Sequence, residues 1–176
     1  RSMDAVYEAS LSVMAIALEE RIDFMSDSSY GLEMTSPALF AAMDLPYIQK
    51  FSDWTHRHGG LFWYHNCGYT SKLISDGVFN TLGADVIETI APPPEGDNDL
   101  AESRSHIDRT ICTKGNLNLR ILRDGLPEQI TQEVQKIATA VRGYAHIVST
   151  ADAVLQGTPP ENLLAFVNAA REAIHA

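Results

Sequence analysis

The chain has 176 residues, of which 45% are hydrophobic and 20% are charged, as expected for a single domain (residues 1–176) with a real hydrophobic core. Its formal net charge of −10 argues against a nucleic-acid partner, because proteins that bind phosphate backbones depend on basic patches. No apolar stretch approaches the length of a membrane span, and two cysteines are too few for a disulfide framework. We therefore expect a soluble, cytoplasmic protein without a membrane partner.

Segments with helical and strand patterns alternate along the chain. An amphipathic helix is predicted over residues 3–20 and a strand over residues 21–27. Ser36 and Pro37 have the form of an N-cap and a first helical turn, and this helix should end near His58. The apolar segment 60–64 reads as the second strand. The remaining expected strands, each separated from the next by a helix, cover residues 85–90, 110–115 and 144–149.

This alternation predicts an α/β fold with a parallel sheet. The strands are short and a polar loop follows nearly every one, which is typical of a (β/α)8 TIM-type barrel. Because such a barrel has eight strands in typically about 250 residues, we interpret the chain as the C-terminal part of a longer barrel with about five strands. An open arc would leave edge strands unpaired, so we expect a homodimer.

The most informative stretch is Tyr64-His65-Asn66-Cys67-Gly68, which begins at the end of the second apolar strand. Residues two apart on a strand point to the same side, so the imidazole and the thiol should leave the strand end together. Histidine and cysteine are the ligands that zinc prefers in proteins. The alternative is that both residues are buried without function, as histidine and cysteine often are.

Two acidic residues lie where they can complete a metal site. Glu88 is near the end of the third strand, and Asp152 comes just after the fifth. A catalytic zinc typically has three protein ligands and one open position, which His65 and Cys67 with either acid would satisfy. Zinc in such a site would lower the pKa of a substrate thiol. Cys112 lies within the fourth strand and is expected in the core.

Other polar residues are weaker candidates. Asp27 at the end of the first strand and Asn116 in the turn after the fourth are candidate substrate-binding residues, because both can hydrogen-bond a polar ligand. Capping and loop solvation explain Asp27 equally well. Asp99 is expected to cap the short helix that follows it, and Thr70 or Ser71 to cap the helix after the His-Cys pair.

Several motifs together resemble the uroporphyrinogen decarboxylase superfamily. They are SPALF, LPYIQKF, HNCG, GADVIE, PPPEGDNDL, KGNLN, and HIVST followed by GTPPENLLAFVNAAREA. The closer similarity is to the zinc-containing branch, the methylcobalamin:thiol methyltransferases of the coenzyme M type. It runs from about Arg21 to the C-terminus, and it implies the later strands of a (β/α)8 barrel.

The resemblance also implies a zinc site and a reaction. In that branch zinc is held by a His-x-Cys pair, matched by His65 and Cys67, and by a later cysteine, whose position is taken here by Asp152. Glu88 lies near the place of a glutamate that serves in related cobalamin-independent enzymes. The implied reaction moves a methyl group from methylcobalamin, carried by a corrinoid protein, to a small-molecule thiol. Two alternatives are a metal-free decarboxylase of a tetrapyrrole or other polycarboxylate, and a truncated, non-catalytic binding module.

Overall fold

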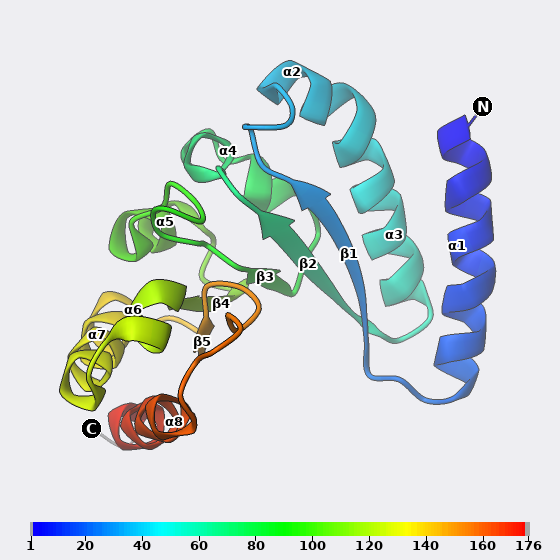
Figure 1. The fold of residues 1–176 in the computed structure, drawn as a ribbon. Coiled ribbons are helices and arrows are strands. Elements are labelled where there is room, and N and C mark those ends of the chain that lie inside the picture. Colours follow the sequence, from blue (N-terminus) through cyan, green and yellow to red (C-terminus); the bar gives the residue numbers. More distant parts are fainter. Residues whose placement is uncertain (1, 175–176) are drawn as a thin grey trace.

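Strands and helices alternate through residues 2–174, the part of the chain that the computed structural model describes (Figure 1). In chain order the elements are α1 (Ser2–Glu19), β1 (Phe24–Tyr30), α2 (Pro37–Leu39), the π-helical turn η1 (Phe40–Asp44), α3 (Leu45–Arg57), β2 (Leu61–Cys67), α4 (Ser71–Ser75), the 3₁₀ turn η2 (Val78–Thr81), β3 (Val86–Glu88), α5 (Leu100–His106), β4 (Cys112–Leu117), α6 (Leu119–Asp124), α7 (Pro127–Ala140), β5 (His146–Thr150) and α8 (Pro160–Ile174).

The five strands form one parallel sheet in the order β1-β2-β3-β4-β5. Each strand pairs with its neighbour in the chain, which is the order of a barrel wall, whereas the order reverses in a doubly wound sheet. Within the described residues the sheet is open, with β1 and β5 at its edges. The predicted fold class, parallel strands that alternate with helices, is confirmed.

The two faces of the sheet have different surroundings, because side chains alternate along each strand. On β2, Tyr64 is fully buried in the main hydrophobic core, on what we call the outer face. His65 and Cys67 point the other way, to an inner face that is half-exposed. The register pairs His65 with Glu88 and Glu88 with Lys114, so these side chains share the inner face.

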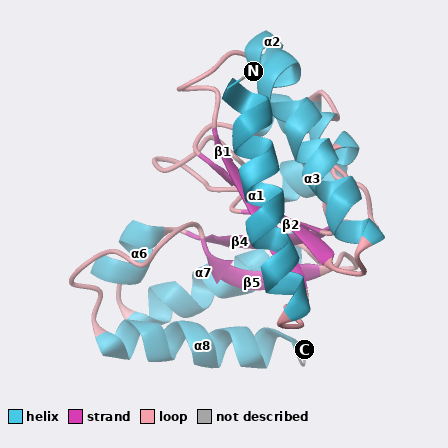
Figure 2. Cartoon of the chain, turned by 90° about the vertical axis from the view of Figure 1, so that its right-hand side faces the viewer, coloured by secondary structure: helices cyan, strands magenta, loops and turns pink. Residues whose placement is uncertain are grey.

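Helices cover the outer face. Helix α3 contacts β1 and β2, α7 contacts β4 and β5, and α8 packs on α7. Helix α1 stands beside α3 at the β1 edge (Figures 1 and 2), where the Tyr7 ring lies 4.8 Å from that of Phe51. None of the helices in the described part of the chain is both long and apolar enough to cross a membrane.

The first strand begins three residues later than predicted. Arg21 has a positive φ of 60°, so the chain turns after α1 and cannot yet run as a strand. Pairing starts where Phe24 meets Leu61, and the strand continues through a Ser-rich segment that pattern alone would assign to a loop. Tertiary pairing with β2 therefore outweighs the weak local propensity of these residues.

Helix caps were predicted with mixed success. Asp99 caps α5 as expected, because its Oδ1 accepts a hydrogen bond from the Glu102 N–H at 2.9 Å. The expectation that Thr70 or Ser71 caps α4 is wrong, since no side-chain cap is made by the N-cap residue. Asp97, from the loop before α5, accepts instead from the N–H groups of both residues, at 2.8 and 3.0 Å.

Candidate metal centre

The end of β2 brings His65 and Cys67 together, as their spacing predicted. His65 Nε2 lies 2.9 Å from Cys67 Sγ, and both side chains are half-buried on the inner face. Gly68 then turns the chain with a φ of +80°. This positive φ favours glycine, and a side chain at this position would also displace the Glu33 carboxylate.

Asp152 reaches this pair from the loop after β5. One ligand atom each from His65, Cys67 and Asp152 lie within 4.8 Å of one another. The backbone of the next residue fixes the Asp152 carboxylate, because Oδ1 accepts a hydrogen bond from the Ala153 N–H at 2.6 Å. In the described residues, this is the one group of three or more potential metal ligands. Its nitrogen, sulfur and oxygen donors are those that zinc takes.

Glu88 lies on the opposite side of the imidazole. Its Oε1 is 2.8 Å from His65 Nδ1, and Lys114 on β4 contacts its other oxygen, Oε2. When Nδ1–H donates to this carboxylate, the lone pair of Nε2 faces Cys67. Glu88 therefore stands outside the three converging ligand atoms and contacts His65 and Lys114.

The charges around the cluster are predominantly negative. Burial, followed by the charge of Asp152 and a hydrogen bond with it, raises the pKa of the Cys67 thiol. The hydrogen bond that His65 donates to the Glu88 carboxylate raises the pKa of His65. Burial alone would raise the pKa of Glu88, but the hydrogen bonds from His65 and Lys114 outweigh it and lower the value. A thiol close to carboxylates is a site whose charge a divalent cation would balance.

The two predicted substrate-binding residues lie away from this cluster. Asp27 pairs with Tyr64 and lies on the outer face, where its Oδ1 accepts from the Ser28 N–H at 2.9 Å. Burial raises the pKa of its carboxyl. Asn116 is buried, and its Nδ2 donates to the Ile90 carbonyl at 3.0 Å. A substrate-binding role for either residue stays a prediction.

Two residues of the inner face differ from expectation. Cys112 pairs with Val86, two residues before Glu88, so it is half-buried on the inner face and not in the core. Lys114 was not singled out from the sequence at all. The signal that would have found it is the register, which places His65, Glu88 and Lys114 in one row across three neighbouring strands. The pattern of one strand does not by itself identify the residues opposite it, because register also depends on the partner strand and on the connection between them.

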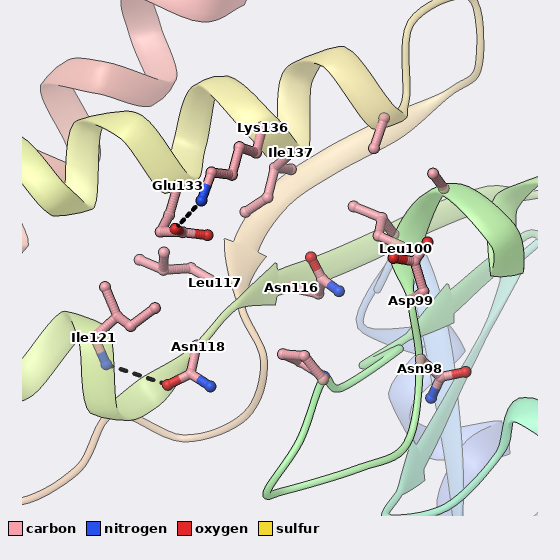
Figure 3. A pocket seen from close by; sticks show the side chains of 13 residues that line it. Asn98, Asp99, Leu100, Asn116, Leu117, Asn118, Ile121, Glu133, Lys136 and Ile137 are labelled. Carbon is pink, nitrogen blue, oxygen red and sulfur yellow. Dashed lines mark hydrogen bonds and ion pairs between the residues drawn. The ribbon is translucent and has the colours of Figure 1, made fainter.

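A separate cavity of about 300 Å³ lies on the outer face between α5 and α7 (Figure 3). Polar side chains line it, but they already have partners in the protein. Asn98 Nδ2 donates to Thr70 Oγ1 at 2.8 Å, and Lys136 Nζ donates to Glu133 Oε1 at 2.6 Å. The cavity shares no residue with the His65 cluster, so we place the candidate site at the cluster.

A family model for uroporphyrinogen decarboxylase (URO-D) matches residues 3–173. The chain belongs to the uroporphyrinogen decarboxylase family. This confirms the resemblance inferred from the motifs, and it extends the match to nearly the whole chain. The His-x-Cys pair, the third strand with Glu88 and the loop with Asp152 all lie within the matched region of this URO-D family chain.

Two curated relatives are similar to parts of the chain. The uroporphyrinogen decarboxylase of Gluconobacter oxydans (strain 621H) is 36% identical over 92 residues, which are 52% of this chain and 24% of that protein. The uroporphyrinogen decarboxylase of Nitrosomonas europaea is 35% identical over 79 residues, which are 44% of this chain and 21% of that protein. The matched regions therefore span less than a quarter of each relative.

A solved structure shares the fold. A methyltransferase from Methanosarcina mazei superposes with a TM-score of 0.81 at 20% sequence identity. The match covers 98% of this chain and 48% of that chain, so this URO-D family chain corresponds to about half of the neighbouring structure. The TM-score establishes a common fold. Because the sequence identity is low, the reaction has to be argued from the site.

Proposed function

We propose that this URO-D family chain is a zinc-dependent methyltransferase domain of the corrinoid type, which moves a methyl group from methylcobalamin to a thiol. A separate corrinoid protein would carry the methyl donor, and a small-molecule thiol would accept the methyl group. The observation that carries the proposal is the convergence of His65, Cys67 and Asp152 within 4.8 Å. Cys67 and Cys112 are both free thiols, as in reducing compartments, so we place the activity in the cytoplasm.

The donor set fits a catalytic zinc better than a structural one. Structural zinc sites are closed by four protein ligands, whereas catalytic sites have three and an open position. His65, Cys67 and Asp152 supply three donors from the ends of two strands. When bound, zinc lowers the pKa of a thiol at the open position, so that a thiolate forms at neutral pH.

The chain's own residues hold the donors in place. Glu88 accepts from Nδ1 of His65 and thereby keeps Nε2 directed toward Cys67 and Asp152. In this proposal Glu88 therefore orients a ligand and is not itself a ligand. Because Asp152 is a harder donor than a thiolate, we expect weaker zinc binding than in a site with two cysteines.

Metal analysis tests the proposal directly. Chain purified under zinc-replete conditions and then dialysed should contain about one zinc ion per molecule, as measured by plasma mass spectrometry. Cys67→Ala should reduce zinc at least about tenfold, because it removes the thiolate donor. Cys112→Ala is a matched control, since this second cysteine lies on the same face outside the ligand group and should retain zinc.

Turnover is tested with methylcobalamin and a simple thiol, and loss of the methyl–cobalt bond is followed by absorbance. Zinc-loaded protein should demethylate the cobalamin faster than the Cys67→Ala variant. If the unmodified chain holds no zinc above background, the proposed function is wrong.

The names of the two curated relatives favour a second candidate, a decarboxylase that acts on a tetrapyrrole without metal. This hypothesis predicts that the chain converts uroporphyrinogen to less carboxylated products, and that a chelator or Cys67→Ala leaves the rate unchanged. Chromatography of the porphyrins after oxidation distinguishes it from methyl transfer. A third hypothesis is a non-catalytic binding module, which predicts neither reaction even when zinc is bound.

A further inference from the structure

We propose that Lys114 is a positioning residue of the metal centre, which fixes Glu88 and through it the orientation of the His65 imidazole. The inference rests on the proposed function, because it concerns the same zinc site. It goes beyond that function by assigning a role to a residue on a third strand, which acts on the metal through two other side chains.

The first argument is the register of the sheet. His65, Glu88 and Lys114 are direct partners on β2, β3 and β4, so their side chains stand side by side on the inner face. Neighbouring strands lie about 4.8 Å apart, so a carboxylate on the middle strand can reach both neighbours. Glu88 does so, with Oε1 at 2.8 Å from His65 Nδ1 and Oε2 in contact with Lys114 Nζ.

The second argument is that neighbouring side chains fix both Glu88 and Lys114. Both oxygens of Glu88 are engaged, and from opposite sides, so its carboxylate cannot rotate without losing a hydrogen bond. Lys114 Nζ also lies 5.3 Å from the centre of the Trp63 ring, which is close enough for a cation–π contact. With 14% of the Glu88 side chain and 27% of that of Lys114 exposed, solvent screens this ion pair only in part.

A competing explanation is that the ion pair only stabilises the sheet. In that case loss of Lys114 lowers the stability of the chain but leaves the metal site unchanged. A positioning role makes a different prediction, since removal of Lys114 frees the Glu88 carboxylate and with it the imidazole. The loss of metal affinity in a Lys114 variant must then depend on the presence of Glu88.

The experiment measures the affinity for Co²⁺, whose thiolate charge-transfer absorbance reports ligation by Cys67, and the affinity for Zn²⁺ by competition with a chelator. Lys114→Met should weaken the affinity for both metals about tenfold, the lower end of the range for residues that orient metal ligands. Lys114→Arg, which retains the charge, should remain within about threefold of the unmodified chain. Lys72→Met is the matched control, because Lys72 pairs with Asp76 on the exposed surface of α4 and should leave affinity unchanged.

A double-mutant cycle completes the test. Glu88→Gln should weaken metal binding on its own, and adding Lys114→Met to it should have no further effect, because Lys114 acts through Glu88. The inference is overturned if Lys114→Met binds Co²⁺ as tightly as the unmodified chain, or if its effect persists undiminished beside Glu88→Gln. If the unmodified chain binds neither metal, the proposed function is wrong. This result can be distinguished from a failure of the Lys114 inference, in which the unmodified chain binds metal.

Should Lys114→Met lose the circular dichroism of the folded chain, Lys114→Gln replaces it with the same expectation. That variant keeps a hydrogen-bond donor and a similar length but removes the charge. An affinity equal to that of Lys114→Arg would then overturn the inference.

Discussion

Gly68 lies at the edge of the candidate metal centre. It follows Cys67 directly, and its φ of +80° turns the chain away from the strand. The carboxylate of Glu33 occupies the space where a side chain would stand and accepts from the Tyr69 N–H at 2.8 Å. The conformation of Gly68 therefore ends the strand directly after the Cys67 thiol.

We predict that Gly68→Ala is more destabilising than Gly59→Ala. The two glycines have nearly the same φ, +80° and +82°, so both variants should share a backbone strain of about 1 kcal/mol. Nothing lies within 4 Å of a Cβ at Gly59, whereas at Gly68 it meets Glu33. Glu33 is an exposed, flexible side chain and can move aside only by giving up its hydrogen bond from the Tyr69 N–H, so Gly68→Ala should lose a further amount of about 0.5–1.5 kcal/mol of unfolding free energy. Urea denaturation measures both variants, and equal losses would contradict the prediction.

At the scale of elements, the loops at the carboxyl ends of the strands hold one another in place. Helix α4, which follows His65 and Cys67 of β2, is capped from the loop before α5. Asp97 accepts from the N–H groups of Thr70 and Ser71 and also from Ser71 Oγ, at 2.6 Å. A residue that is distant in sequence thus fixes the start of the helix after the candidate metal site.

We therefore predict that Asp97→Ala is more destabilising than Asp99→Ala. Asp97 makes three hydrogen bonds in a partly buried position, and their loss should lower the free energy of unfolding by about 2–3 kcal/mol. Asp99 makes one exposed capping bond, whose loss should cost about 1 kcal/mol. Urea denaturation of the two variants gives the comparison, and a larger loss for Asp99→Ala would refute this account of the α4 cap.

At the scale of the whole molecule, the sheet formed by the described residues has two edge strands and an uncovered inner face. Its inner face presents apolar side chains to solvent, among them Leu61, of which 53% is exposed, and Phe24, of which 47% is exposed. Edge strands and apolar faces of this kind are usually covered in proteins. We propose that a second copy of the chain covers this face, as expected from the sequence.

This proposal predicts a dimer at micromolar concentration in sedimentation experiments. Leu61→Glu should weaken association about tenfold or more, because a two-fold interface buries the introduced charge twice. Leu126→Glu is a control of the same residue type, since Leu126 is 64% exposed in the loop before α7 and away from the inner face. A monomer at all concentrations would contradict the proposal.

The hydrophobic pattern of the sequence predicted more of the fold than of the candidate site. Alternating strands and helices, and a strand that ends in His65 and Cys67, could be recognised because they depend on short-range periodicity. The roles of Glu88 and Lys114 could not, because a carboxylate in a neighbouring strand can contact either the cation or the histidine. That choice depends on register, which involves residues 23 and 26 positions apart.

The sequence by itself determined the parallel α/β architecture, the family and the direction in which His65 and Cys67 leave their strand, because local periodicity and motif order encode these features. Only the tertiary structure decided that Asp152 joins them while Glu88 contacts the back of the imidazole. The physical reason is that ligand geometry depends on the lateral stagger of strands and on loop closure, and both result from packing of the whole sheet.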